Sequence, residues 1–230
     1  MHSSNMPLEL DHLFVCTEVG APEVDCLIEL GFLEGSPNTH PGQGTANRRI
    51  FFRNAKLEFL WICNEVEARS TEIARTRLWE RGRYGQTGYA PFGICVRWRS
   101  PEDAISQSLP FAIWDFHPPY LPPTLSIDVA SQTLPTEPMI FATPFSRRPD
   151  TLSGDRAQPL EHDNGCREIT RLRLSIPQGA PLSDAALALQ EIDEIDIVRA
   201  SKFWVEVECD RGRQNQTYVG EPDALLRICG

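Results

Sequence analysis

The chain has 230 residues, of which 41% are hydrophobic and 23% are charged, and it carries a formal net charge of −10 at pH 7. These proportions are typical of a globular protein and exclude wholesale disorder. The negative charge argues against nucleic acid, because proteins that bind it use basic surfaces to release counterions. It also disfavours binding to anionic membrane surfaces. We therefore expect neither nucleic acid nor a membrane among the partners.

The sequence contains no stretch that approaches the roughly 20 apolar residues needed to span a bilayer. Its first residues, MHSSNMPLEL, have neither a basic start nor an apolar core, so no signal peptide is expected. The seven cysteines are odd in number and include no Cys-x-x-Cys pair. Four of them lie in apolar, strand-like runs, where a reduced thiol behaves as a small buried hydrophobe: Cys16, Cys63, Cys95 and Cys209. We expect a reducing, cytoplasmic location.

The first part of the chain, residues 8–63, alternates in the manner of strands around one amphipathic helix. The predicted elements are a strand LDHLFVCT, a helix APEVDCLIEL, and the strands GFLEG, RRIFFRN and KLEFLWI. Pro22 near the start of the helix and Gly31 just after its end fit the preferences of helix termini. The order of elements is βαβββ.

The same order recurs in residues 91–145 and 167–230. The second copy reads PFGICVRW, a helix SPEDAISQSL, then FAIWDFH, LSIDVAS and PMIFATPF. The third reads EITRLRLSI, a helix PLSDAALALQEI, then IDIVRAS, FWVEVECD and ALLRICG. The polar segment 146–166, rich in Pro and Gly, is predicted to be a surface linker. A single βαβββ unit cannot bury both faces of its sheet. We therefore expect an α+β fold of about three βαβββ modules forming curved mixed sheets around a cleft, in a single domain over residues 1–230.

Two polar side chains stand out among apolar neighbours in the first copy. His12 lies in the first predicted strand and Glu58 in the fourth. A lone histidine in a sheet is usually only hydrogen-bonded. A buried carboxylate is costly without a cation or a donor, so either a metal or an arginine should lie beside Glu58.

The segment HPGQGTANRR supplies further candidates, because its glycines permit a tight connection near the cleft. His40, Thr45 and Asn47 would then meet a ligand. The alternative is a plain turn in which Thr45 and Asn47 bond to their own backbone.

A βαβββ repeat with "DH" in its first strand and "LE" in its fourth resembles the vicinal oxygen chelate superfamily, which includes glyoxalase I and extradiol dioxygenases. The stretch HPGQGTANRRIFFRNAKLEFLWI is similar to the first part of glyoxalase-like domain proteins. EPMIFATPF and HDNGCREITRLRL resemble later segments of that group. The likeness extends over most of the chain, from about residue 8 to residue 230.

The resemblance implies a divalent metal (Zn, Ni, Mn or Fe) between paired modules, which binds two neighbouring oxygens of a small-molecule substrate. Carried to this chain, His12 and Glu58 become metal ligands, with Glu58 also the catalytic residue. Such an ion can stabilise an enolate or bind dioxygen. A homodimer is a further expectation.

The later copies depart from this pattern. Gly93 and Arg171 stand at the position that corresponds to His12, and Ile140 and Arg227 at that of Glu58. Two ligands are few, because catalytic zinc usually has three from the protein. The candidates to complete the site are His40, His162, Glu206 and Glu208. Arg171 and Arg227 would bind the anion of a substrate, or else arginines of this copy pair internally with Glu58, Glu206 or Glu208.

Two functions follow as hypotheses. The first is a metal-dependent isomerase, lyase or dioxygenase acting on a small, oxygenated, anionic molecule. The second is a non-catalytic small-molecule-binding protein of the same superfamily with an incomplete metal site.

Overall fold

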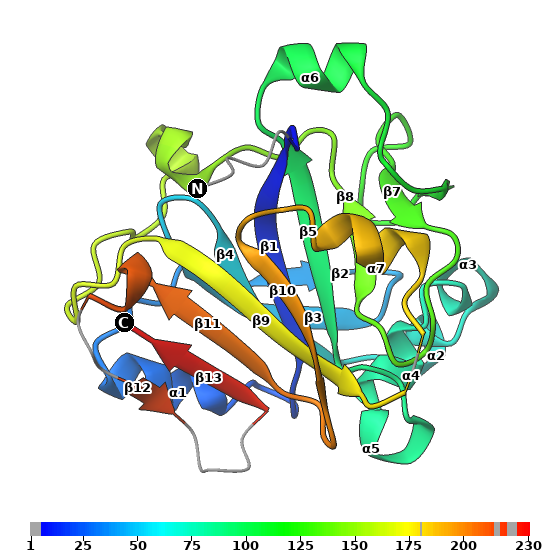
Figure 1. Ribbon diagram of the computed structural model, residues 1–230. Helices are drawn as coiled ribbons and strands as arrows, with labels where there is room; N and C mark the ends of the chain where they lie inside the picture. The colour runs from blue at the N-terminus through cyan, green and yellow to red at the C-terminus, as the bar shows by residue number, and fades with distance from the viewer. Residues whose placement is uncertain (1–5, 180, 214–216, 220–224) are drawn as a thin grey trace.

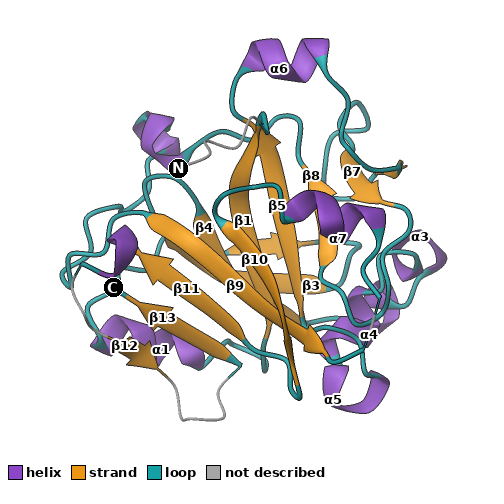
Figure 2. Ribbon diagram, in the orientation of Figure 1, coloured by secondary structure: helices purple, strands orange, loops and turns teal. Residues whose placement is uncertain are grey.

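A computed structural model describes residues 6–179, 181–213, 217–219 and 225–230. It contains two mixed β-sheets and short helices (Figure 1, Figure 2). The large sheet has eight strands in the order β2-β3-β4-β1-β5-β8-β7-β6, and the small sheet has five in the order β10-β9-β11-β13-β12. The predicted α+β class with repeated βαβββ units is confirmed.

The first half of the large sheet follows the predicted order of elements. It comprises β1 (Leu8–Cys16), α1 (Glu23–Glu29), β2 (Asn38–His40), β3 (Thr45–Phe51) and β4 (Lys56–Ile62). β1 runs parallel to β4, which pairs antiparallel with β3. Four short helices then lead to the second half: α2 (Glu65–Ala68), α3 (Thr71–Ala74), α4 (Leu78–Gly82) and α5 (Tyr84–Thr87).

The second half repeats this pairing. It comprises β5 (Phe92–Trp98), α6 (Pro101–Ser106), β6 (Ile113–Phe116), β7 (Ile127–Ala130) and β8 (Met139–Ala142). β5 runs parallel to β8, as β1 does to β4, and the two halves join through the antiparallel pair β1 and β5. Helix α6 begins as expected, because the Ser100 hydroxyl accepts a hydrogen bond from the Asp103 amide and Pro101 occupies the first turn.

The third unit begins alike but pairs its strands differently. Its elements are β9 (Ile169–Pro177), α7 (Asp184–Leu189), β10 (Ile195–Ala200), β11 (Val205–Cys209), β12 (Thr217–Val219) and β13 (Leu226–Cys229). Three 3₁₀ turns complete the chain: η1 (Pro149–Thr151), η2 (Gly154–Arg156) and η3 (Asp210–Gly212). β9 runs parallel to β10, whereas β13 runs parallel to β11 and not beside β9. The expected equivalence of Arg227 on β13 with Glu58 on β4 is therefore wrong.

The small sheet lies over one face of the large sheet, and the main hydrophobic core fills the space between them (Figure 1). The core contains fully buried side chains from β1, β4 and β5 on one side and from β9, β11 and α7 on the other. The opposite face of the large sheet carries a second apolar cluster: Phe14, Cys16, Leu60, Ile73, Leu78, Cys95, Phe116, Ile127, Val129, Met139 and Phe141. This second face is the one that holds the candidate site.

A β-bulge in β1 decides which side chains reach that face. Leu10 lies opposite Val96 of β5, but the next paired residue of β1 is His12, opposite Cys95. Asp11 is therefore an extra residue in β1. The core-facing positions shift accordingly, from Leu8 and Leu10 before the bulge to Leu13 and Val15 after it. Since side chains of a regular strand alternate, only this shift allows both Asp11 and His12 to face away from the main core.

All seven cysteines are free thiols. Cys16, Cys95 and Cys209 are buried, as the sequence predicts, whereas Cys63 is exposed at the end of β4. No described helix is both long enough and apolar enough to cross a membrane.

Gly44, in the turn between β2 and β3, has a φ of +74° and packs against the start of α2. We expect Gly44→Ala to destabilise the protein by roughly 2–4 kcal/mol, because the new methyl group adds a collision with the Asn64 carbonyl oxygen to the strain of a positive φ. Gly88→Ala is the matched control, since its φ of +73° is nearly the same and nothing lies within 4 Å of the added carbon. Urea unfolding of both variants measures the difference. Equal losses in the two variants would contradict the close contact at Gly44.

Candidate functional site

A cavity of about 240 Å³ opens on the second face of the large sheet, and we call it the inner chamber. Its polar lining comes mostly from β1, β2 and β4 and includes His12, His40, Lys56 and Glu58. Its apolar lining consists of Phe14, Leu60, Leu78, Phe116, Leu121, Ile127, Met139, Phe141 and Phe145. The charged groups therefore gather at one side of a largely apolar space.

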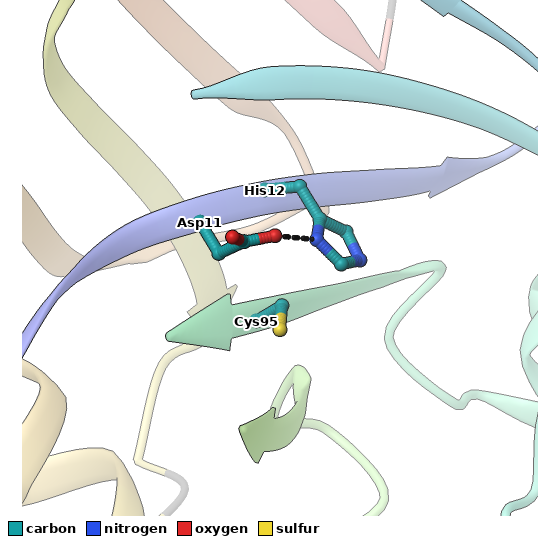
Figure 3. A group of neighbouring side chains, drawn as sticks. All are labelled: Asp11, His12 and Cys95. Carbon is teal, nitrogen blue, oxygen red and sulfur yellow. Dashed lines mark hydrogen bonds and ion pairs between the residues drawn. The ribbon is translucent and has the colours of Figure 1, made fainter. Parts of the chain in front are cut away.

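His12 is held in one orientation by its neighbour in the bulge. Its Nδ1 atom lies 2.5 Å from Asp11 Oδ1, so the Nδ1–H donates to the carboxylate (Figure 3). Its ring packs edge-on against Phe141, with 5.4 Å between ring centroids. Nε2 is left without a hydrogen-bond partner among the described residues and lies 4.0 Å from Glu58 Oε2. Nε2 is thus the ring nitrogen that faces Glu58 and the inner chamber.

Lys56 lies between the two carboxylates of the site. Its Nζ atom is 3.3 Å from Asp11 Oδ1 and 3.5 Å from Glu58 Oε1. Burial acts to lower the pKa of Lys56, but the charges of Asp11 and Glu58 outweigh it and raise the pKa. The ammonium group therefore remains charged at neutral pH.

Glu58 remains ionised in this surrounding. Asn47 Nδ2 donates a hydrogen bond of 2.8 Å to Glu58 Oε2. Burial acts to raise the pKa of Glu58, but His12, Lys56, Arg49 and His40 together lower it to about 2. The carboxylate that the sequence singled out thus has a cation and a donor beside it, as its burial demands.

Asp11 is also ionised, although it is almost completely buried. Arg97 Nη1 lies 2.9 Å from Asp11 Oδ2, and the Ser146 hydroxyl donates to the same oxygen. Burial acts to raise the pKa of Asp11, but Lys56, His12 and Arg97 hold it well below its usual range. Asp11 therefore connects His12 to two buried cations.

The hairpin of β2 and β3 carries His40 at the end of β2, and Thr45 and Asn47 on β3. Asn38 Nδ2 donates to His40 Nε2 at 3.1 Å, which leaves His40 Nδ1–H to donate to the Thr45 hydroxyl at 2.9 Å. Burial lowers the pKa of His40, in keeping with a neutral ring. His40 lines the inner chamber, whereas Thr45 positions His40, and Asn47 positions Glu58. The alternative of a plain turn with only local backbone bonds is not what is observed.

The structure does not bring the predicted arginines of the third unit to this site. Arg171 is half exposed on the small sheet, where its Nε lies 3.1 Å from Asp196 Oδ2, and Arg227 also lies on that sheet. Neither residue lines the inner chamber. Internal pairing, the other expectation for arginines of this copy, is seen at Arg173, whose Nη1 lies 2.9 Å from Glu206 Oε1. The cations nearest to Glu58 come from β3 and β4 instead.

Three of the residues expected to complete the metal site, His162, Glu206 and Glu208, do not line the inner chamber. His162 is buried between Phe32 and Phe52, and its Nδ1 accepts a hydrogen bond from the Leu33 amide. Glu206 and Glu208 lie on β11 of the small sheet. In the second unit, Ile140 faces the main core, so Met139 and Phe141 are the β8 side chains that line the chamber.

Sequence reasoning missed Lys56, Arg49 and Asp11. Lys56 precedes Glu58 by two residues on one strand, so the strand period already placed both on the same face. Arg49 lies opposite Glu58 in the β3–β4 register, which the hairpin pattern could have supplied. In LELDHL the leucines alternate at Leu8 and Leu10, but the next leucine follows at position 13 instead of 12. This break in the alternation indicates the bulge at Asp11.

One group of potential metal ligands appears among the described residues. Atoms of Asp11, His12 and Cys95 lie within 4.8 Å of one another, with Asp11 and His12 on β1 and Cys95 on β5 (Figure 3). Burial and the charge of Asp11 raise the pKa of the Cys95 thiol well above its usual range, so it keeps its proton. Asp11 is already paired with Lys56 and Arg97. Since a metal ligand must be free to coordinate, the existing pairing of Asp11 argues against a resident divalent ion in this group.

The pair His12 and Glu58 is also incomplete. His12 Nε2 and Glu58 Oε2 are 4.0 Å apart, but no third described ligand atom forms a group with both. His40 Nε2 is occupied by the Asn38 amide. Lys56 already balances the charge of Glu58. The donor set therefore falls short of the three protein ligands usual at a catalytic zinc site.

The sequence matches no protein-family model and no curated protein. Among solved structures, a hypothetical protein from Staphylococcus aureus matches with a TM-score of 0.56 at 11% identity, covering 97% of this chain and 99% of that one. At this identity the likeness shows a shared fold alone.

Two further structures match at lower TM-scores. One is a xylose isomerase-like TIM barrel/4-hydroxyphenylpyruvate dioxygenase fusion protein, with a TM-score of 0.48, 12% identity, and coverage of 90% of this chain and 37% of that one. The other is a triple mutant of 4-hydroxymandelate synthase from Streptomyces coelicolor, with a TM-score of 0.43, 13% identity, and coverage of 81% of this chain and 52% of that one.

The pKa of Glu58, lowered from 4.5 to about 2, predicts a specific dependence of stability on pH. A lowered folded-state pKa contributes stability above the unfolded value, and this is lost as the pH falls through the folded pKa. We expect the wild type to lose on the order of 3 kcal/mol more than Glu58→Gln between pH 6 and pH 2, measured by urea unfolding at each pH. The exposed Glu72 supplies the control variant Glu72→Gln, which should follow the wild type. If the free energy of unfolding falls by the same amount in the wild type and in Glu58→Gln over this pH range, the pairing of Glu58 with Lys56 is refuted.

Proposed function

We propose that this chain binds a small oxygenated molecule in the inner chamber, and that Lys56 supplies the positive charge that a divalent ion would supply in a metal-dependent glyoxalase-like protein. The observation that carries this proposal is the partly buried ammonium group of Lys56, which lies 3.3 Å from Asp11 Oδ1 and 3.5 Å from Glu58 Oε1. This proposal corresponds to the non-catalytic binding protein with an incomplete metal site. Lys56 and Arg97 balance the charges of Asp11 and Glu58 in place of a metal.

The arrangement supports proton transfer as well as binding. Nε2 of His12 can accept a proton from a ligand, and Asp11 would stabilise the imidazolium that forms. The Lys56 ammonium can stabilise negative charge on a ligand oxygen. The apolar walls around them exclude water, which strengthens each of these interactions.

The metal-dependent enzyme is the second candidate. One observation favours it, because metal-binding histidines usually donate their other ring N–H to a carboxylate, as His12 does to Asp11. In this alternative an ion would be held by His12 and Glu58, and Lys56 would have to move away from Glu58. A third ligand would also be needed.

Metal analysis separates the two candidates. We expect purified wild-type protein to contain far less than one equivalent of Zn, Ni, Mn or Fe per chain, at a level that His12→Ala does not change. We also expect none of the four ions to raise the melting temperature of the wild type, because the carboxylates are already neutralised. One equivalent of metal that disappears in His12→Ala would establish the metal-dependent candidate instead.

Lys56→Met tests the role of the ammonium group directly. It leaves Asp11 and Glu58 buried with one cation fewer, and we expect a loss of about 3–5 kcal/mol in the free energy of unfolding at pH 7. The loss should shrink near pH 3 as carboxylates protonate, and Zn²⁺ should restore part of the stability at pH 7. Lys202→Met, at an exposed lysine, is the control. If Lys56→Met unfolds at the same urea concentration as the wild type, the ammonium group does not balance this site.

A further inference from the structure

We propose that the ligand is an amphipathic anion, with an apolar body in the inner chamber and an anionic head group bound by Arg49, Arg147 and Arg156 in a second, adjoining chamber. This inference rests on the proposed function, because it specifies the class of molecule that the inner chamber binds. It is argued from the position, charge and anchoring of the second chamber.

The second chamber, which we call the outer chamber, has a volume of about 540 Å³. Four residues line both chambers: Arg49, Lys56, Phe145 and Ser146. The remaining lining of the outer chamber is Asp11, Ser36, Phe51, Arg147, Pro149, Leu152, Asp155, Arg156 and Gln158. The two chambers therefore adjoin at these four residues.

Among the described residues, the three arginines of the outer chamber have no carboxylate within ion-pair distance. Within the described residues, none of Arg49, Arg147 and Arg156 forms an ion pair within 4.0 Å. Their sequence neighbours do: Arg48 pairs with Asp25 and Glu34, and Arg148 pairs with Asp150 and Glu168. In a chain with a net charge of −10, three unpaired guanidinium groups around one cavity leave a local positive charge. Guanidinium groups bind carboxylates and phosphates by charge-assisted, often bidentate hydrogen bonds.

The acidic residues of the outer chamber do not cancel this charge. Asp11 is already matched by Lys56 and Arg97. Asp155 is the other carboxylate in the lining, and it is exposed. Arg49 is partly buried, and its Nε donates to the Ser36 carbonyl at 2.7 Å, so its guanidinium group is held at the junction of the chambers. Glu58 lies opposite Arg49 in the β3–β4 register but forms no ion pair with it within 4.0 Å, so this partly buried cation still favours an anion as its partner.

The wall that carries Arg147 and Arg156 is anchored to the first half of the large sheet. Ser146 donates to Asp11, and Gln158 Oε1 accepts hydrogen bonds of 3.0 Å from both the amide and the hydroxyl of Ser36. The amide of Asp150 donates to the Arg53 carbonyl at 3.1 Å. The segment predicted as a surface linker thus forms one side of the cavity.

The inner chamber itself suits the uncharged part of such a ligand. Five phenylalanine and tyrosine rings line it, those of Phe14, Phe116, Tyr120, Phe141 and Phe145, and its volume of about 240 Å³ matches a small body. The Glu58 carboxylate lines this chamber and lies 3.5 Å from Lys56 Nζ, so a second negative charge deep in the chamber would be repelled. The anionic head is thereby directed outward, toward Arg49 and the outer chamber.

Isothermal titration with probes of one body and different head groups tests this inference. The probes are benzyl phosphate, benzyl alcohol and benzylamine, together with inorganic phosphate alone. We expect benzyl phosphate to bind at least about 10-fold more tightly than benzyl alcohol or inorganic phosphate, with benzylamine weakest. The affinity for benzyl phosphate should fall as NaCl is added, because salt screens exposed charges.

Variants locate the head group. The double variant Arg147→Gln, Arg156→Gln changes exposed side chains, and it should weaken benzyl phosphate by about 10-fold or more while leaving benzyl alcohol unchanged. Arg199→Gln removes one positive charge from an exposed position on β10 of the small sheet and is the control for net charge. It should bind every probe as the wild type does.

The outcomes distinguish this inference from the proposed function. Equal affinity for benzyl phosphate and benzyl alcohol, or no effect of the double variant, would overturn the anionic head group while the inner chamber remains a binding site. Inorganic phosphate bound as tightly as benzyl phosphate would overturn the amphipathic ligand. Failure of every probe to bind would count against the inner chamber as a ligand site and thus against both.

Discussion

The β-bulge at Asp11 is the constraint on which the inner chamber depends. In a regular strand, Leu8, Leu10 and His12 would all point to one face, and that face belongs to the main core. The extra residue turns His12 to the other face and places Asp11 beside it. Bulges often re-aim side chains next to functional sites. β1 thus contributes aliphatic side chains to the main core from one face and His12 to the inner chamber from the other. The bulge thereby keeps His12 out of the aliphatic core.

The charged side chains around the bulge, those of Asp11, Lys56, Glu58 and Arg97, stabilise one another. A buried ion pair gains little unless its remaining hydrogen-bonding groups are also satisfied. Here Asp11 is contacted by His12, Lys56, Arg97 and Ser146, and Glu58 by Asn47 and Lys56. Apolar side chains of similar volume would fill the same space without the cost of removing charges from water. A ligand-facing role accounts for charges at this position better than stability does.

The sequence predicted the elements of the fold well because strand and helix periods are local properties. The pairing of β13 with β11 was not predicted, since strand register in a distant unit depends on contacts that periodicity does not contain. The meeting of His12 and Glu58 was anticipated through a family resemblance, whereas Arg171 and Arg227 were assigned by repeat position and lie on the other sheet. Lys56 is not predicted from the metal-site pattern, because an ammonium group has no lone pair with which to bind a metal.

The role of segment 146–166 cannot be predicted from its composition. Its Pro, Gly and polar residues resemble a linker, yet Ser146, Gln158 and His162 each bond to the first half of the large sheet. These contacts span more than 100 residues of sequence, so no local pattern reveals them. They place unpaired arginines beside a chamber whose own charges are balanced. In a strongly acidic protein, whose overall field repels anions, such a local positive region selects where an anion can approach.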